Sequence, residues 1–234
     1  VPVGEKLFEE GMDSDGIFVV LKGKGELVNS SVCLPVVSGD FLGIWDMQTG
    51  RYNTGCIATE EMTVFAFPAT TDEELLTFLD GNKEYSGRVT ATLGRLIAEL
   101  HTKLGCYLQE AKMLPNVIEE LYRQYCARCK AEELRAAELP KAGKEVFSVS
   151  DSPEWLEYYL EAAKIPAEAQ KNYFTCDAKV AYRHIEEQVT ILRWLFAECE
   201  KQGAFLRRLG SVLMNGGADN LFFYFCALEE KAGT

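Results

Sequence analysis

The first 67 residues consist of short apolar runs, each closed by glycine or by acidic turn residues. The runs lie at 6–8, 16–21, 33–37, 42–45 and 57–67, with the turn Ser-Gly-Asp-Phe at 38–41. Short strands at regular spacing, with Gly and Asp between them, are typical of a small β-barrel or a double-sheet roll. The sequence therefore predicts an antiparallel β-roll of the jelly-roll kind over residues 1–82.

A helical region follows the predicted roll. Thr71 is expected to cap a short helix with acidic residues in its first turn. The next segment, 84–114, contains no proline and has apolar residues at alternating intervals of four and three: Leu93, Ile97, Leu100, Leu104, Tyr107, Ala111 and Leu114. This heptad rhythm predicts a long helix whose seam either joins two copies in a homodimer or packs within the same chain.

The remaining chain is also expected to be helical. The pattern predicts a second helix over 116–139, a Gly-, Pro- and Lys-containing linker at 140–149, and several helices beyond it. One is capped by Ser152 and Pro153, one is capped by Asp177 and reaches Cys199, and a separate amphipathic helix is expected over 205–214. The predicted fold class is α+β, with a roll followed by a long helix and an all-α C-terminal bundle. The expected domains are 1–82, 83–139 and 150–234.

The order of the predicted strands and turns resembles the cyclic-nucleotide-binding domain of the catabolite activator protein (CRP/FNR-like) family. The matching motifs are PVGEKLFEEG at 2–11, FVVLKG at 18–23, GDFLG at 39–43 and TVFAF at 63–67. The glycines of these motifs would lie where the roll turns sharply, with a positive φ or a close backbone approach. The resemblance covers about a third of the chain and implies a pocket after the GDFLG turn.

The implied pocket departs from the family's pattern. There, a glutamate after the turn holds the ribose hydroxyl, and an arginine about ten residues on holds the cyclic phosphate. Here Ile44 stands at the position of the acid, Tyr52 at that of the arginine, and Arg51 one residue early. A slip of one residue on an extended segment turns a side chain to the opposite face. The sequence predicts a degenerate pocket, with binding through Arg51, or of another small ligand, as the alternative.

The residues of this candidate pocket all belong to the segment that follows the turn. They are Gly43, Ile44, Trp45, Arg51, Tyr52, Asn53 and Thr54. A cyclic nucleotide or another small ligand is the cofactor that the resemblance allows, and none is required by the residues themselves.

The acidic residues are concentrated in the predicted roll. The whole chain carries a formal charge of −12, and residues 1–82 hold 14 Asp and Glu against 4 Lys and Arg. Affinity for nucleic acid depends on clustered Lys and Arg, so DNA binding by this part is disfavoured. The acidity is otherwise expected to keep the domain in solution.

The cysteines and the apolar runs indicate a cytoplasmic protein. Eight cysteines are scattered through apolar contexts, which fits free thiols in a reducing compartment. The longest apolar run, 221–228, is too short to span a membrane. The chain starts without Met, directly in the first roll motif, so we expect a fragment of a longer protein.

No group of residues has the spacing of a catalytic or metal site. His101 and His184 have no Ser, Cys or acid partner at local spacing. Cys126 and Cys129 share one helix face but would leave a metal with two ligands unsupplied, so core packing is favoured. The glycines at 216 and 217 follow no predicted strand and therefore indicate a helix break.

These observations predict a non-enzymatic regulatory or sensor module in which a roll is coupled by a long helix to a helical effector domain. The alternative is a ligand-responsive transcriptional regulator whose DNA-binding part is disguised in 150–234, although no recognition helix is evident there. The apolar segment 221–228 is expected to be core, or else a docking surface for a protein partner or a missing domain.

Overall fold

The computed structural model describes residues 1–47, 49–165, 178–214, 224, 225 and 227, without the side chains of residues 83 and 214. These residues form two compact units. Unit 1 comprises residues 1–103 and 151–199, and unit 2 comprises 104–150 and 200–234. Each unit is therefore assembled from two stretches of the chain. The domain boundaries 1–82, 83–139 and 150–234 stay predictions.

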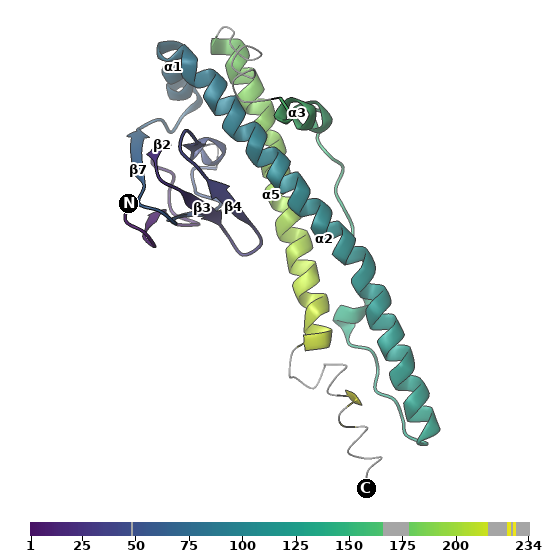
Figure 1. Cartoon of the computed structure of the whole chain (residues 1–234). Helices are drawn as coiled ribbons and strands as arrows, with labels where there is room; N and C mark the ends of the chain where they lie inside the picture. The colour runs from purple at the N-terminus through teal and green to yellow at the C-terminus, as the bar shows by residue number, and fades with distance from the viewer. Residues whose placement is uncertain (48, 166–177, 215–223, 226, 228–234) are drawn as a thin grey trace. The chain divides into compact units, whose positions relative to one another are not determined.

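The N-terminal part of unit 1 is a roll of two antiparallel sheets (Figure 1). One sheet has the strand order β1-β6-β3-β4 and the other has the order β5-β2-β7. The strands are β1 (Lys6–Phe8), β2 (Ile17–Lys22), β3 (Gly25–Val28), β4 (Cys33–Val36), β5 (Phe41–Leu42), β6 (Gly55–Ala58) and β7 (Thr63–Phe67). Together with the helices that follow, this confirms the predicted α+β class.

Central strand β3 fixes the register of the larger sheet. Leu27 lies opposite Leu34 of β4 and Cys56 of β6. All three side chains are buried, so this face of the sheet forms part of the core of the roll. Alternation of buried and more exposed positions along β3 and β4 is the pattern of strands with one face on the core.

Two glycines allow turns that no other residue would permit. Gly23 has a φ of 89°, and a Cβ there would lie 2.2 Å from the carbonyl oxygen of Glu61. Gly43 has a φ of 87°, and a Cβ there would lie 2.5 Å from the carbonyl oxygen of Gly16. Both positions need the left-handed conformation and a close backbone approach, which only glycine accepts without strain.

Two of the expected strands have different boundaries in the structure. Of the run at 42–45, only Leu42 lies in a strand, because the left-handed Gly43 ends β5 and starts a short 3-10 helix, η1 (Ile44–Asp46). The run at 57–67 is divided between β6 and β7. A turn that contains Glu60 and Glu61 separates the two strands. The apolar residues on either side of these acids made the two strands look like one run in the sequence.

Helix α1 (Asp72–Gly81) begins as the sequence predicts. The Thr71 hydroxyl accepts the backbone N–H of Glu74, and the Glu74 carboxylate accepts the backbone N–H of Thr71. This reciprocal capping box satisfies two amides that the first helical turn leaves without partners. The apolar face of α1 packs on the roll, where Phe78 contacts the rings of Phe41 and Phe67.

Helix α2 (Lys83–Ala131) runs through Pro115, where the sequence predicts a helix end. A proline inside a helix removes one N–H bond and crowds the carbonyl four residues earlier, but the helix can continue when packing holds it. Similarly, α5 (Ala178–Met214) is continuous, whereas the sequence predicts two helices there. The predicted helix ends at Pro115 and between 199 and 205 are therefore wrong.

In unit 1, helices α2 and α5 pack beside the roll, and α3 packs on α5. The Gln188 side chain of α5 donates to the carbonyl oxygen of Thr90 of α2 at 3.0 Å, and both residues are buried. Helix α3 (Leu156–Ala163) has Trp155 as its N-cap and thus begins later than the expected cap at Ser152 and Pro153. The expected cap at Asp177 lies outside the described residues.

The apolar side chains of the heptad seam of α2 are buried or half-buried in the structure. Leu93, Ile97 and Leu100 have no exposed area, Leu104 is buried, and Tyr107 is half-buried. These side chains pack against other parts of the same chain, which is the second of the two possibilities that the sequence allows for the seam. The homodimer itself stays a prediction.

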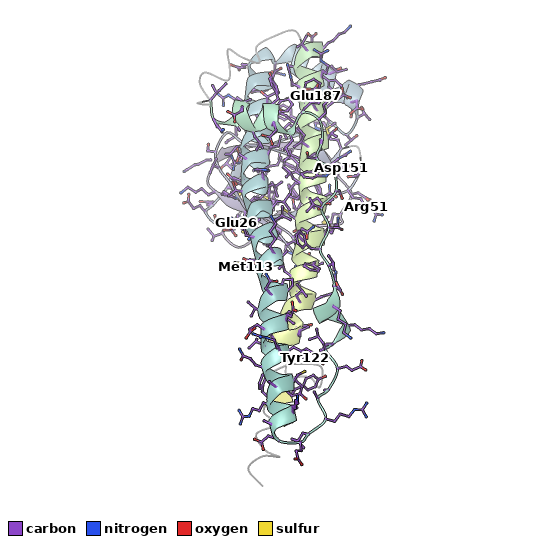
Figure 2. The ribbon with its side chains drawn as sticks, turned by 90° about the vertical axis from the view of Figure 1, so that its right-hand side faces the viewer. Glu26, Arg51, Met113, Tyr122, Asp151 and Glu187 are labelled. Atoms are coloured by element: carbon purple, nitrogen blue, oxygen red, sulfur yellow. The ribbon has the colours of Figure 1, made fainter. Side chains whose placement is uncertain are left out.

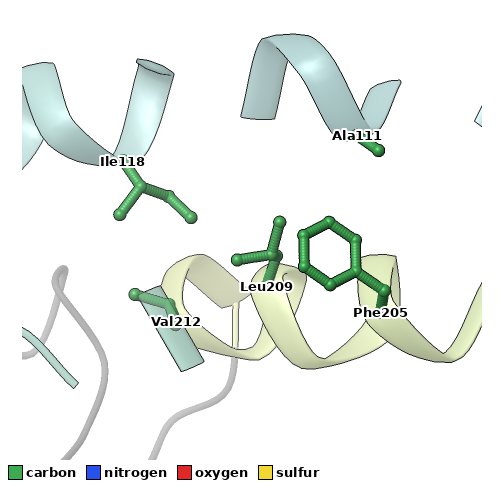
Figure 3. Packing of buried hydrophobic residues seen from close by; sticks show 5 residues of the cluster. All are labelled: Ala111, Ile118, Phe205, Leu209 and Val212. Atoms are coloured by element: carbon green, nitrogen blue, oxygen red, sulfur yellow. The ribbon is translucent and has the colours of Figure 1, made fainter. Parts of the chain in front are cut away.

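Unit 2 contains the second halves of α2 and α5. Its core consists of two residues of α2 and three of α5, which face each other in Figure 3: Ala111, Ile118, Phe205, Leu209 and Val212. The Tyr122 hydroxyl, labelled in Figure 2, donates to the carbonyl oxygen of Ala137 at 2.9 Å. This bond holds the chain that follows α2 along the end of the helix. The expected linker at 140–149 contains a short 3-10 helix, η2 (Lys141–Lys144).

Within the described part of the chain, no helix combines the length and the apolar character that crossing a membrane requires. Of the apolar segment 221–228, only residues 224, 225 and 227 are described. Tyr224 and Phe225 pack on Tyr125 in unit 2. The prediction of a docking surface or of a missing domain at this segment stays a prediction.

Candidate functional site

The segment that the resemblance marks as a ligand pocket connects β5 to β6. We call residues 43–54, described at 43–47 and 49–54, the connecting segment. It opens at Gly43, which turns the chain into η1. Ile44 and Trp45 are buried in η1, so neither presents a side chain to solvent. An apolar residue therefore occupies the first position of η1, directly after the turn.

Asp46 holds the connecting segment together. Its backbone carbonyl oxygen accepts the Thr49 hydroxyl at 2.8 Å and the Gly50 N–H at 3.0 Å. One carboxylate oxygen, Oδ1, accepts the Asn53 N–H at 2.9 Å. Burial raises the pKa of Asp46 to about 7, an effect that the bond from Asn53 and the nearby Arg193 only partly oppose. The acid is thus a structural centre of the segment.

Tyr52 fills the position assigned to the arginine. Its ring is buried and stacks on Phe8, with ring centroids 4.1 Å apart. The hydroxyl donates to Asp15 Oδ1 at 2.6 Å. Burial, with the Asp15 carboxylate as a second cause, raises the pKa of Tyr52 to about 12. Tyr52 thus contributes a neutral phenol that is hydrogen-bonded to a carboxylate.

Arg51 lies on the opposite side of the chain. Its side chain is 70% exposed, and its Nε lies 3.6 Å from Asp13 Oδ1 (Arg51 is labelled in Figure 2). An exposed ion pair of this kind contributes little to stability. Because Tyr52 points inward, the alternation of side chains along an extended segment turns Arg51 outward. Arg51 and Tyr52, one residue apart, thus point to opposite faces of the segment.

The last two candidate residues lead into β6. The Asn53 carbonyl oxygen accepts from the Asn29 side chain at 3.4 Å, while the Asn53 N–H is the donor to Asp46. Thr54 is fully buried, and its hydroxyl has no hydrogen-bond partner among the described residues. All seven candidate residues therefore lie in one segment, but the segment holds its polar groups mainly against itself.

Helix α5 contacts the connecting segment directly. Arg193 donates from Nε and Nη2 to the carbonyl oxygen of Trp45, at 3.2 and 3.1 Å. The ring of Trp45 also packs near-parallel to Phe196, with centroids 6.5 Å apart. Burial lowers the pKa of Arg193, and the carboxylates of Asp46 and Asp72 oppose this effect. A partly buried cation of α5 thus holds the backbone of η1.

Helix α2 contacts the turn that precedes the segment. Arg95 donates from Nη2 to Asp40 Oδ2 at 2.6 Å, and from Nη1 to the carbonyl oxygen of Pro35 at 3.0 Å. The same oxygen of Asp40 accepts the backbone N–H of Val37 at 2.7 Å. Asp40 of the GDFLG motif therefore closes its own turn and binds α2.

Sequence reasoning missed the partners of the connecting segment. Arg95 and Arg193 lie far along the chain, on helices whose apolar pattern carries no mark of a contact with the roll. The available signal was at Arg193, which stands four residues after Val189 and three before Phe196 and therefore lies on the apolar face of its helix. An arginine in such a position is expected to need a partner.

The structure gives His184 two partners, and one of them is an acid at local spacing. Glu187 Oε2, three residues further along α5, lies 3.8 Å from His184 Nδ1, so the expectation of no such partner is wrong. The Tyr159 hydroxyl of α3 lies 2.8 Å from His184 Nδ1 and donates to Glu187 Oε2 at 2.5 Å. Burial lowers the pKa of His184. Tyr159 is 25 residues distant in the chain, and its contacts fasten α3 to α5.

The described cysteines are free thiols: Cys33, Cys56, Cys106, Cys126, Cys129 and Cys199. Cys129 is buried against Tyr125 in unit 2, as core packing requires. Within the described ranges, no three His, Cys, Asp or Glu side chains are grouped so as to hold a metal ion. A cytoplasmic location stays a prediction.

Solved structures that are similar to part of this chain include the two that follow. One is a protein assigned as a cyclic nucleotide-binding protein, from Geobacter metallireducens GS-15, with 25% identity over 33% of this chain and 60% of that one, and a TM-score of 0.30. The other is the N-terminal domain of a transcriptional regulator from Streptomyces coelicolor A3(2), with 22% identity over 41% of this chain and 71% of that one, and a TM-score of 0.30.

Both TM-scores are too low to establish a common overall fold, so the fold assignment depends on the strand topology described above. This chain spans less than two thirds of the Geobacter structure that it matches. No protein-family model matches the chain, and no curated protein matches it in sequence.

Proposed function

We propose that the chain is a non-enzymatic regulatory module, related to cyclic-nucleotide-binding domains, in which the roll transmits its state to the helices of unit 1. The observation that carries the proposal is the pair of hydrogen bonds from Arg193 of α5 to the Trp45 carbonyl oxygen. A change in the conformation of the connecting segment would alter these bonds and thereby the position of α5. A regulator needs such a link between the site that changes and the element that responds.

We further propose that the roll does not bind a cyclic nucleotide by the family's contacts. Ile44 offers no acceptor to a ribose hydroxyl, and the buried Tyr52 with Asp15 fills the phosphate position. Each lost charge-assisted contact weakens binding by about 1.5–3 kcal/mol. The loss of two contacts would therefore lower affinity by roughly 10²–10⁴-fold. The proposed input is a protein or another ligand that acts on the connecting segment.

Calorimetric titration tests this proposal. The chain is titrated with cyclic AMP and with cyclic GMP, and Arg51→Ala serves as the matched variant. We expect no saturable heat from either protein at sub-millimolar nucleotide. Saturable binding by the parent chain that Arg51→Ala abolishes would show that Arg51 reaches the phosphate, and the proposal of a degenerate pocket would then be wrong.

A further inference from the structure

The carboxyl group of Asp46 is in an unusual position for an acid. The residue has no exposed area, and Oδ2 has no hydrogen-bond partner among the described residues. The other oxygen, Oδ1, accepts one bond, from Asn53. An ionised carboxylate in such a setting is destabilised, because the protein replaces few of the bonds that water would give it.

The charges around Asp46 come from two helices. Arg193 of α5 is the cation that attracts the carboxylate, but it directs two of its N–H groups to the Trp45 carbonyl oxygen. Asp72, at the start of α1, faces Arg193 and competes for the same positive charge.

Two further groups of α5, Tyr182 and Glu186, lie beside η1 across a small crevice that Asp72 also lines. Burial raises the pKa of Tyr182, with Glu186 and Asp72 as further causes, so the phenol stays neutral in the neutral pH range. Among the described residues, Arg193 is thus the cation that acts on the Asp46 carboxyl, and Asp72 draws on the same positive charge. The attraction of Arg193 does not offset the burial of Asp46, so the folded segment favours the neutral carboxyl below about pH 7.

We propose that Asp46 makes the connecting segment a proton-controlled latch, which stays closed against α5 while its carboxyl is neutral and opens when the carboxyl ionises. Opening would expose the carboxylate to water and release the Trp45 carbonyl oxygen from Arg193. The latch rests on the coupling proposed above and adds its regulation, with a change in proton concentration as the signal.

The expected pH dependence follows from the two states of the acid. In the closed segment the pKa is about 7, and in the open, hydrated segment it returns toward the ordinary value of 3.8. The population of the open state therefore rises by up to about tenfold per pH unit between these two values and levels off above the higher one. The segment is most closed in weak acid and most open just above neutrality.

Hydrogen exchange on the unliganded chain tests the latch. The amides of Gly50 and Asn53 report on the segment, since both donate to Asp46. After correction for the intrinsic exchange rate, we expect their protection to fall by up to about a hundredfold from about pH 5 to about pH 8. The amide of Leu27, in the centre of the larger sheet, is the internal control and should change much less.

The variant Asp46→Asn keeps the shape of the side chain and cannot ionise. Its protection at Gly50 and Asn53 should be high and independent of pH, and an equal pH dependence in this variant would overturn the latch. If the variant does not fold, carboxyl carbon resonances of the parent chain decide the matter. A titration midpoint of Asp46 near neutrality supports the latch, whereas a midpoint near the ordinary value excludes it.

Arg193→Gln gives an independent check. Because the guanidinium favours the ionised carboxylate, its removal should move the midpoint of the Asp46 titration to higher pH, and an unchanged midpoint would argue against the proposed surroundings. All these measurements are made without nucleotide. Binding of a cyclic nucleotide would therefore contradict the degenerate pocket and leave the latch standing, while a pH-independent segment would contradict the latch alone.

Discussion

Asp40 and Arg95, 55 positions apart in the chain, join the roll to helix α2 through a contact of 2.6 Å between Oδ2 and Nη2. The Asp40 side chain is 6% exposed and that of Arg95 is 29% exposed. The same aspartate closes the turn before β5 by accepting the Val37 N–H. The turn that introduces the connecting segment is thus fixed to α2 at its start, while η1 is fixed to α5 by Arg193.

Replacement of Arg95 by methionine should destabilise unit 1. The substitution keeps most of the side-chain volume but leaves the buried Asp40 carboxylate without its cation. Breaking a buried or partly buried ion pair by removing one partner costs several kcal/mol, and the partial exposure of Arg95 reduces this to about 2–3 kcal/mol. Urea unfolding, followed by circular dichroism, measures the free energy of unfolding.

Arg123→Met is the control for this substitution. Arg123 pairs with Glu120 on the surface of α2, and both side chains are largely exposed. Such a pair contributes at most about 1 kcal/mol, so the control should lose far less stability than Arg95→Met. Equal losses in the two variants would mean that the Asp40 contact has no special role in holding the turn.

The heptad seam of α2 can be tested as a core element. Ile97→Ala removes a side chain with no exposed area and should reduce the free energy of unfolding by about 2–5 kcal/mol. Met113→Ala changes an exposed residue of the same helix (labelled in Figure 2) and should change stability by less than about 0.5 kcal/mol. Sedimentation velocity is run alongside. A stable Ile97→Ala variant with an altered oligomeric state would identify the seam as an interface between chains.

Replacement of Pro115 by alanine should stabilise unit 2. Alanine restores a backbone N–H that can donate to the carbonyl oxygen of Ala111, and it removes the clash of the proline ring. Proline in a helix interior is about 3 kcal/mol less favourable than alanine, so we expect a gain of about 1–3 kcal/mol. Pro140→Ala is the control, because the φ of −52° at that position suits proline. A loss of stability in Pro115→Ala would indicate that the packing of α2 requires a bend there.

The stability of unit 1 should depend on pH through Asp46. The pKa of this acid is raised from 3.8 to about 7 in the folded chain, so the folded state binds the proton more tightly than the unfolded state. The resulting stabilisation is fully present below the unfolded value and is lost as the pH rises through about 7. A shift of about three units corresponds to on the order of 4 kcal/mol.

Urea unfolding of the parent chain and of Asp46→Asn at several pH values measures this contribution. The variant should be more stable than the parent above neutrality, and the two should converge in acid. A parent chain whose stability does not fall between pH 4 and pH 7 relative to the variant would show that Asp46 ionises normally in the fold.

Most strands of the roll could be predicted because their signals are local, but the central strand β3 was not among the predicted runs. Gly23 and the GDFLG motif mark turns that only glycine can make. Thr71 and Glu74 form a capping box within four residues. One failure involves a contact between segments that are distant in the chain. Pro115 is an ordinary helix breaker by sequence, yet α2 continues through it, with Ala111 and Ile118 on either side of the proline packed against α5.

The contacts of the candidate site could not be predicted from local patterns. Trp45 and Arg193 are 148 positions apart, and neither residue type in its own segment indicates the other. The inward position of Tyr52 and the outward position of Arg51 did follow from counting along an extended segment. The burial of Asp46 did not, since it depends on which helix covers η1.

The most direct test of the coupling between the roll and α5 is a comparison of hydrogen exchange in Arg193→Gln and Arg88→Gln. Both variants remove one positive charge from unit 1, but Arg88 is exposed on α2. We predict that Arg193→Gln increases exchange at the amides of Asp46, Gly50 and Asn53, whereas Arg88→Gln leaves them unchanged. Equal exchange in the connecting segment of both variants would contradict the proposal that α5 and this segment move together.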